Sequence, residues 1–338
     1  MDKNNEWFTM EKTLFVDILR EKKLMLPPLS GYTDYPYRKI LAKFKPPFIT
    51  TEMVNARAVI GNNKNTTERL KKEEGTHLRG VQLLGKDPKY MKKAAITIRN
   101  LGFDYIDINM GCTVRKVVSK GEGISLMKNE DLACKIVKTV SEAVDVPVTV
   151  KLRAGFSKES INVVSLSKKL EDAGAAAVTI HGRTGEKKFN PEMDLNVIRD
   201  VAEALFIPVI ANGGVFSSDD AKNALIKTGA SAVMPGRGII GNPWLVTEIL
   251  YGFSEESFIS PSLKERKDVC IEHVKSNCSY YGVRNGVCKM RKIVARYFPL
   301  AKNLKFLKVD MQNAKTVDEI FSILNKIKEI DTVWIYER

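Results

Sequence analysis

The chain has 338 residues, a formal net charge of +14 and a pI near 9.4, with 44% apolar and 28% charged residues. This length allows one large domain and a small one, and the composition is that of a globular protein. No run of 18 apolar residues occurs and the N-terminal segment is charged throughout, so we expect neither a membrane span nor a signal peptide. The five cysteines form no CxxC pair and are odd in number. We therefore expect no disulfide framework, no bound metal and a cytoplasmic location.

Short apolar runs rich in β-branched residues alternate with amphipathic segments along most of the chain. The runs lie at 23–29, 47–53, 79–85, 105–111, 147–153, 176–182, 207–214 and 231–238. The helical segments lie at 88–101, 129–144, 161–173, 195–205 and 218–228. Alternation of this kind predicts parallel βαβ units, and eight units match an α/β fold closed as a (β/α)₈ TIM barrel. We assign the barrel to residues 22–253, after an N-terminal extension at 1–21.

After Trp244 the pattern becomes helical and shows no convincing strand. Ser, Glu and Pro cluster between residues 253 and 262, which favours a domain boundary there, and we predict a small helical domain over 254–338. Residues 273–309 contain nine Lys or Arg and no Asp or Glu, with aromatic residues among them. A merely solvated face usually mixes both signs, so we favour a nucleic-acid partner.

Five basic residues of this stretch are candidates for contacts with nucleic-acid phosphates. They are Arg284, Lys289, Arg291, Lys292 and Arg296. A continuous helix through 289–296 would place Lys289, Lys292 and Arg296 on one face, by the i, i+3, i+7 spacing.

Polar residues recur at the ends of the predicted strands, where the active face of such a barrel lies. They are Ser30, Glu52 with Asn55, Gln82, Asn109 with Cys112, Lys151 with Arg153, His181 with Arg183, Asn212 with Gly213 and Gly214, and Gly236 with Arg237. If these positions had only a structural role, several of them would be apolar or turn-like. The pattern therefore predicts one site at the carboxyl ends of the strands.

Glycine-rich loops follow the last two predicted strands, at 211–214 and 236–238. Glycine lets backbone N–H groups approach phosphate oxygens, and Arg237 adds a charged fork, so the pair predicts a cofactor-phosphate site. The string at 236–241 also matches GxGxxG. We reject a dinucleotide site there, because the string follows the last strand and Pro243 interrupts the helix it would begin.

Cys112 lies in a glycine-rich loop that runs to Gly123, whereas the other four cysteines lie within helical patterns. Its thiol could be a nucleophile, a metal ligand or a proton donor, and no neighbouring His or Cys at ligand spacing supports a metal. Lys151 and His181 follow two adjacent strands, and such a pair suits an anionic reduced flavin. A core histidine is the alternative for His181.

The motifs, taken together, resemble those of the tRNA-dihydrouridine synthases over residues 22–300. They are PPLSGYTDYPYR (27–38), TEMVNARA (51–58), VQLLG (81–85), IDINMGCTVRKV (106–117), KLRAGF (151–156), IHGRT (180–184), IANGGV (210–215) and MPGRGIIGNPW (234–244). The resemblance implies an FMN-bound barrel, NADPH as the reductant and a helical domain that binds tRNA. In this family a Pro usually follows the Cys; Thr113 stands there instead, so φ is not fixed but the thiol stays in place.

The resemblance also implies roles for individual residues. Cys112 would be the general acid, and Asn109 would hold the uracil, with Arg153 and Arg183 also in the substrate site. The FMN site would be formed by Pro28, Ser30, Gln82, Lys151, His181, Asn212, Gly213, Gly214, Gly236 and Arg237. The predicted reaction delivers hydride from FMN to C6 of a flipped uracil and a proton from Cys112 to C5.

Three alternatives to this function differ in substrate or in activity. A dihydroorotate-type dehydrogenase would share the barrel and FMN, but it would not need the basic helical tail. A catalytically silent RNA-binding protein is disfavoured by the intact set of Cys112, Lys151, His181 and Arg237. The same reaction on ribosomal RNA is the third alternative. We expect the protein to be a monomer.

Overall fold

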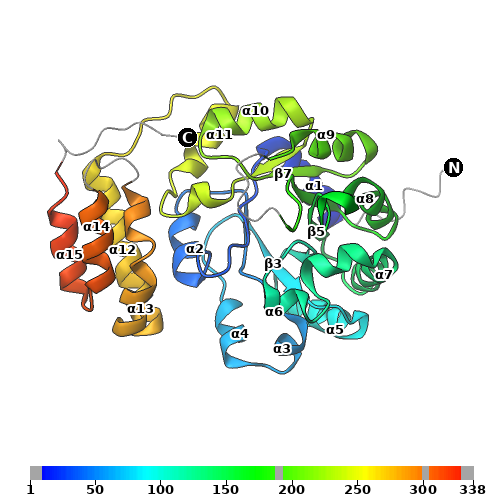
Figure 1. The fold of residues 1–338 in the computed structure, drawn as a ribbon, viewed down its shortest axis with the longest axis horizontal. Coiled ribbons are helices and arrows are strands. Elements are labelled where there is room, and N and C mark those ends of the chain that lie inside the picture. The colour runs from blue at the N-terminus through cyan, green and yellow to red at the C-terminus, as the bar shows by residue number, and fades with distance from the viewer. Residues whose placement is uncertain (1–9, 187–192, 299–303, 329–338) are drawn as a thin grey trace.

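Parallel strands form the centre of the larger part of the chain, and helices surround them (Figure 1). The computed structural model describes residues 10–186, 193–298 and 304–328. The strands are β1 Phe48–Thr50, β2 Val54–Asn55, β3 Leu78–Leu84, β4 Tyr105–Asn109, β5 Val148–Arg153, β6 Ala177–His181, β7 Val209–Asn212 and β8 Ala232–Met234. They pair in parallel in the order β1-β3-β4-β5-β6-β7-β8, with β2 pairing beside β3. The predicted (β/α)₈ barrel is confirmed.

The strand predicted at 23–29 differs from the expectation. It is not a continuous strand but two isolated parallel bridges, in which Leu24 pairs with β8 and Leu26 pairs with β1. Pro27 and Pro28 follow directly, and a proline has no backbone N–H to donate to a neighbouring strand. The two bridges close the barrel between its last and first strands, and we call this junction the seam.

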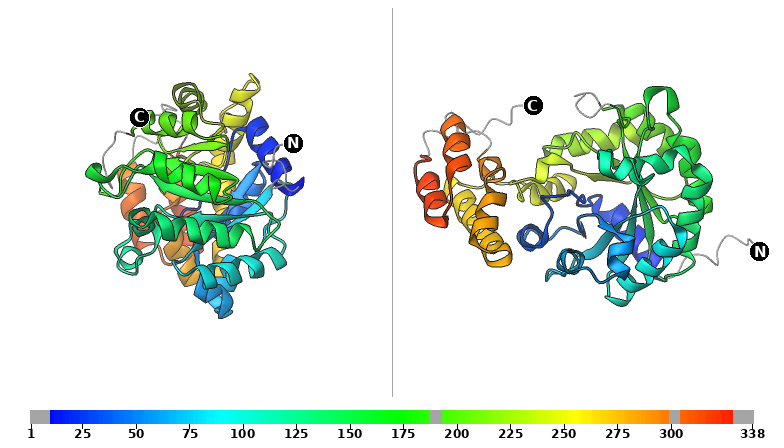
Figure 2. Two further views of the ribbon diagram at one scale, coloured as in Figure 1. Left: turned by 90° about the vertical axis from the view of Figure 1, so that its right-hand side faces the viewer. Right: turned by 60° about the horizontal axis from the view of Figure 1, so that its bottom comes forward.

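Helices connect the strands and cover the outside of the barrel (Figures 1 and 2). They are α1 Met10–Lys22, α2 Tyr35–Ala42, α3 Ala56–Ile60, α4 Lys64–Arg69, α5 Pro88–Asn100, α6 Arg115–Val118, α7 Glu130–Ser141, α8 Val163–Asp172, α9 Leu195–Ala204, α10 Ser218–Thr228 and α11 Leu245–Phe253, with 3₁₀ turns η1 Gly123–Lys128, η2 Lys158–Ser160 and η3 Arg237–Ile239. The five helical segments predicted between strands are all present. Side-chain caps begin several of them, for example Asp87 at α5 and Ser217 at α10.

Strand residues alternate between the outside and the inside of the barrel. On β4, Ile106 and Ile108 belong to the apolar layer that packs against the outer helices. Tyr105, Asp107 and Asn109 point the other way, because successive side chains of a strand face opposite sides. The interior is therefore apolar where the strands begin and polar where they end, which places the polar residues at the carboxyl face.

Helix α1 closes the opposite end of the barrel. Phe15 and Leu19 are fully buried and belong to a cluster with the first residues of several strands, including Phe48 and Tyr105. The rings of Phe15 and Phe48 lie 5.0 Å apart in an edge-on arrangement. Part of the segment that the sequence assigns to an extension is thus part of the barrel core.

The remaining helices form a bundle on one side of the barrel (Figure 2). They are α12 Leu263–Tyr281, α13 Val283–Met290, α14 Leu304–Asn313 and α15 Val317–Asn325, with the 3₁₀ turn η4 Val294–Tyr297. Residues 254–262 connect α11 to α12 without helix or strand. In the described residues, no helix is both long and apolar enough to cross a bilayer.

One apolar core joins the bundle to the barrel. It contains Tyr37 and Ile40 of α2 together with Val274 of α12 and Met290 of α13, all of them buried. His273 stacks on the Tyr37 ring at 4.8 Å and bonds to the Tyr297 hydroxyl at 2.9 Å. The bundle therefore buries apolar surface of the barrel as well as its own.

Candidate functional site

The carboxyl ends of neighbouring strands bring the predicted site residues together. Pairing places Asn109 of β4 opposite Lys151 of β5, and Arg153 of β5 opposite His181 of β6. His181 in turn lies opposite Asn212 of β7. Five residues named from separate stretches of sequence thus occupy one face of the barrel, as the strand-end pattern predicts.

A chain of hydrogen bonds connects Gln82 and Asn109 to the Cys112 loop. The Asn109 Nδ2 donates to Gln82 Oε1 at 2.7 Å. The Asn109 Oδ1 accepts the backbone N–H groups of Gly111 at 3.2 Å and Cys112 at 2.9 Å. Gln82 donates through Nε2 to Asp107 Oδ2 at 2.6 Å. Asp107 is absent from the residues predicted for the site, although a lone acid in the apolar run at 105–111 was a visible signal.

Cys112 lies partly exposed in its loop and is held from two sides. Its backbone N–H donates to Asn109, and its carbonyl accepts the N–H of Ile124 at 3.1 Å. Gly123 packs against it with φ of +61°, and a Cβ at that position would lie 2.8 Å from the Cys112 carbonyl oxygen. Only glycine fits this close approach. The other four cysteines lie on helices α7, α12 and α13, as predicted.

Cations gather at the same face. Lys151 donates to Asn212 Oδ1, and the Asn212 Nδ2 donates to the Met234 carbonyl at 2.9 Å. Burial lowers the pKa of Lys151 and raises the pKa of Asp107, and each charge partly offsets the effect of burial on the other. Burial and the charge of Arg183 lower the pKa of Arg153. A site that holds several cations against one acid is suited to an anionic ligand.

His181 is neutral at physiological pH. Burial lowers its pKa to about 2, and the nearby charges of Lys151 and three arginines add to the shift. Its Nε2 lies 3.5 Å from Arg183 Nη1. An uncharged imidazole there donates or accepts one hydrogen bond but adds no charge to the cation cluster.

The two glycine-rich loops lie side by side, and the second follows β8, which borders the seam. Gly213 and Gly214 have φ of +112° and +70°, a backbone conformation that favours glycine. A Cβ on Gly238 would lie 2.4 Å from the Val215 carbonyl oxygen, so the loops are in contact. Gly236 has open space beside it, and the exposed Arg237 begins η3. Accessible backbone and an exposed arginine fork fit a phosphate group.

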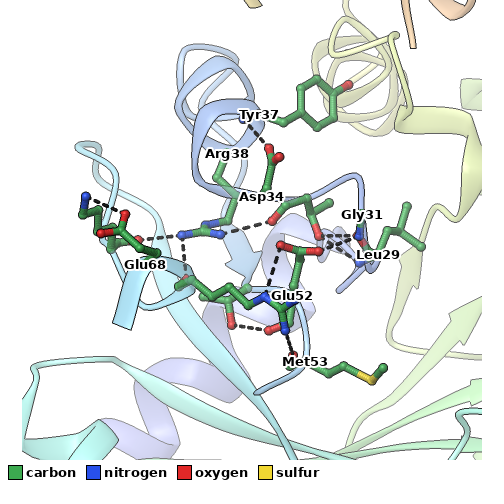
Figure 3. A network of polar contacts seen from close by, with 12 residues as sticks. Leu29, Gly31, Asp34, Tyr37, Arg38, Glu52, Met53 and Glu68 are labelled. Carbon is green, nitrogen blue, oxygen red and sulfur yellow. Dashed lines mark hydrogen bonds and ion pairs between the residues drawn. The ribbon is translucent and has the colours of Figure 1, made fainter. Parts of the chain in front are cut away.

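Pro28 and Ser30 lie in a loop that a network of polar contacts holds (Figure 3). The Leu29 N–H donates to the Thr33 hydroxyl at 2.8 Å, and the Gly31 N–H donates to Glu52 Oε1 at 2.5 Å. Because the loop follows the seam, it reaches the same face as the glycine-rich loops. The sequence predicts Glu52 only as a polar residue at a strand end. Its hydrogen bond with the Gly31 N–H joins residues 21 positions apart, and no local pattern predicts it.

Arg38 fixes this loop to the segment that follows α4. It is fully buried and donates to the Thr33 carbonyl at 3.1 Å and to Glu73 Oε2 at 2.8 Å. Further bonds reach the Arg69 and Lys71 carbonyls at 3.2 and 2.5 Å (Figure 3). A buried ion pair of this kind is costly to break, since the remaining partner would be left as an uncompensated charge.

The continuous helix expected over residues 289–296 is not present. Helix α13 ends at Met290, and η4 begins only at Val294. Residues of η4 pack on the barrel: a Cβ on Gly241 would lie 2.6 Å from the Arg296 Cβ. The i, i+3, i+7 face of Lys289, Lys292 and Arg296 therefore does not form.

The five basic candidates have different surroundings. Lys289 lies 3.3 Å from Asp34 Oδ2 and 4.3 Å from the Tyr281 ring centroid, and Lys292 lies 4.2 Å from the Tyr32 ring centroid. The Arg291 guanidinium donates to the Ala314 carbonyl at 3.0 and 2.6 Å. Arg284, Lys292 and Arg296 are exposed. Lys289 and Lys292 thus lie where the bundle meets the barrel face.

Comparison with known proteins identifies the family. A family model described as "Dihydrouridine synthase (Dus)" matches residues 25–331. A probable tRNA-dihydrouridine synthase of Rickettsia conorii is 38% identical over 81% of this chain and 83% of its own. The tRNA-dihydrouridine synthase B of Pasteurella multocida is 37% identical over 82% of this chain and 84% of its own.

A solved structure supports the fold alone. Histamine dehydrogenase from Rhizobium sp. 4-9 superposes with a TM-score of 0.51 at 14% identity, over 75% of this chain and 49% of that protein. The family match covers most of the chain. The chain belongs to the dihydrouridine synthase family.

Proposed function

We propose that this protein reduces the C5–C6 bond of uridine in tRNA, with FMN as its cofactor and NADPH as the reductant. The observation that carries the proposal is the placement of Cys112 beside Asn109, at the same barrel face as the half-buried Lys151 and the glycine-rich loops. An acid–base group and an anion site at one barrel mouth are what a flavin-dependent reduction of a base requires.

The residues at the barrel mouth fit FMN by their chemistry. The backbone of Gly213, Gly214 and Gly236 and the Arg237 guanidinium would hold the phosphate, since Gly236 has open space beside it and Arg237 is exposed and charged. The isoalloxazine ring would contact Lys151, His181 and Gln82, with Pro28, Ser30 and Asn212 completing the site. A cation near the ring favours a reduced, anionic flavin. Bound FMN supplies the hydride that the reaction needs at uracil C6.

Cys112 has the task of supplying the proton at C5. A thiol carries an acidic proton, so it can donate to the carbanion that forms when C6 is reduced. The S–H bond breaks, a C5–H bond forms, and the thiolate then takes a proton from water. Asn109 would hold the uracil, while Arg153 and Arg183 add charge for the RNA backbone. Reaching this site requires the base to leave the RNA stack.

The RNA would lie across the barrel face and the bundle. Arg284, Lys292 and Arg296 are exposed, and Lys289 lies at the junction with the barrel. Their charge would make binding depend on salt. We infer tRNA rather than ribosomal RNA, because the similar proteins carry tRNA in their names. We further infer a cytoplasmic monomer.

The test records the flavin spectrum during reduction by NADPH and during reoxidation by tRNA. Protein purified with its cofactor should release FMN on heating, and NADPH should bleach the flavin under anaerobic conditions. Unmodified tRNA should then restore the oxidised spectrum and acquire dihydrouridine, detected by its mass. Reoxidation by orotate alone would establish the dehydrogenase alternative, and reoxidation only by a ribosomal RNA fragment would change the substrate.

The phosphate assignment has a separate test. Arg237→Ala removes a charge-assisted contact that typically contributes about 1.5–3 kcal/mol, so the FMN dissociation constant should rise roughly tenfold or more. Arg199→Ala is the matched control, because Arg199 faces Glu203 on the outer helix α9. Equal FMN affinity in the two variants would remove Arg237 from the site, and recovery of FAD would overturn the cofactor assignment.

A further inference from the structure

Asp107 is a buried carboxylate that has no role in the proposed reaction. It lies inside the barrel on β4 and is 2% exposed. Its Oδ1 accepts from the Thr149 hydroxyl at 2.7 Å and its Oδ2 accepts from Gln82 at 2.6 Å. A carboxylate is expensive to bury even when it is hydrogen-bonded. Its presence among apolar strands therefore calls for a reason other than packing.

The hydrogen bonds that begin at Asp107 fix which way each neighbouring amide is turned. An ionised carboxylate only accepts, so the Gln82 nitrogen faces Asp107 and the Gln82 oxygen faces Asn109. That oxygen accepts from the Asn109 nitrogen at 2.7 Å, which turns the Asn109 oxygen to the backbone N–H groups of Gly111 and Cys112. Backbone N–H groups only donate. Both ends of the chain thus require the same orientation of the two amides.

We propose that Asp107 is a positioning residue whose carboxylate sets the direction of the Gln82 and Asn109 amides and, through Asn109, holds the start of the Cys112 loop. These three side chains, Asp107, Gln82 and Asn109, form what we call the amide relay. All three are at least nine-tenths buried, so water does not substitute freely for the missing partner when one bond is lost.

The direction of the relay also determines what it presents to a ligand, an extension that rests on the proposed function. Each amide nitrogen carries two hydrogens, and the relay uses one of them. The remaining N–H groups of Gln82 and Asn109 suit the carbonyl oxygens of a flavin ring and of uracil. The Asn109 nitrogen otherwise lies 3.8 Å from the Met53 sulfur, a weak acceptor that a carbonyl displaces. Reversed amides would present oxygen to oxygen.

Three substitutions in the holoprotein separate the direction of the relay from its charge. Asp107→Leu removes the acceptor. Asp107→Asn removes the charge but keeps the direction, because its oxygen can accept from Gln82 while its nitrogen donates to Thr149. Thr149→Val is the matched control, since it removes the other hydrogen bond of the same carboxylate and leaves Gln82 in place.

Amide hydrogen exchange of a peptide that contains Gly111 and Cys112 reports the last bonds of the relay. Asp107→Leu should speed their exchange roughly tenfold or more, whereas Asp107→Asn and Thr149→Val should exchange like the parent. Should Asp107→Leu not fold, Gln82→Met breaks the relay at its middle and should speed the same exchange. Parental exchange in Asp107→Leu or Gln82→Met, or equal acceleration in Thr149→Val, would overturn the proposal.

A double-mutant cycle connects the relay to the reaction. If Asp107 acts through Asn109, Asp107→Leu should lower kcat for uridine reduction in the parent but not in an Asn109→Ala background. Additive losses would show that Asp107 acts by another route. The experiments distinguish failure of the proposed function from failure of the amide relay. A parent that reduces no uridine ends the proposed function while exchange still reports the relay, and an active parent with unchanged exchange in Asp107→Leu ends the relay alone.

Discussion

At the scale of single residues, Cys112 carries the sharpest prediction. Cys112→Ala should keep FMN bound and NADPH oxidation intact, while tRNA reduction falls by roughly 10²–10⁴-fold, the usual contribution of a general acid. Cys134 and Cys288 lie on helices away from the strand ends, and their alanine variants serve as controls. Normal tRNA reduction by Cys112→Ala would move the proton donor to another residue.

His273 makes stability depend on pH. Burial lowers its folded pKa to about 4, so the unfolded chain, with an ordinary pKa near 6.5, binds a proton first as pH falls. This contribution to stability is complete above pH 6.5 and is lost as pH falls towards 4. Between pH 8 and pH 5.5 the parent should lose roughly 1 kcal/mol of unfolding free energy more than His273→Gln. Urea titrations at both pH values measure the difference; equal losses would refute the assignment.

At the scale of elements, the basic side chains need a different experiment from the one that a continuous helix suggests. Reversing Lys289 to Glu would place a carboxylate against Asp34 and disturb the junction itself. Neutral changes at Arg284, Lys292 and Arg296 avoid this effect. Removing one phosphate-binding side chain should lower the slope of log affinity against log salt by about 0.7–0.9. Lys275→Gln is the control, since Lys275 lies over Phe321 of α15. A triple variant with the parental slope would end the RNA-contact proposal.

The sequence predicts the strands and their polar ends well, because both follow from local patterns. The alternation of apolar and polar residues along 105–111 is enough to place Asn109 at a strand end. The glycine-rich loops can be recognised from their composition. The break after Met290 could not be predicted, since no Gly or Pro stands between Met290 and Val294 and the packing of Arg296 on Gly241 joins residues far apart in sequence. The pairing of Asp107 with Gln82 likewise depends on strand register.

At the scale of the whole molecule, the shared apolar core predicts that barrel and bundle unfold together. Trp244 lies at the junction, 5.6 Å from the Phe44 ring and 6.3 Å from the Tyr297 ring. Its environment should change at the same urea concentration as far-UV circular dichroism and flavin release. Two separated transitions would show that the bundle is an independent unit. A variant that retains only Trp244 among the three tryptophans assigns the fluorescence signal.

The seam has a consequence for how the protein is made. Leu24 leaves the ribosome early, whereas its partner in β8 is synthesised only after most of the barrel. Domains start to fold as they emerge, yet this barrel cannot close until β8 is available. Pro28 and Ser30 lie on one side of the seam and Gly236 on the other, so a nascent chain lacks part of the proposed cofactor site until translation has passed both. We therefore expect cofactor loading only after β8 has been synthesised and Leu24 has paired with it.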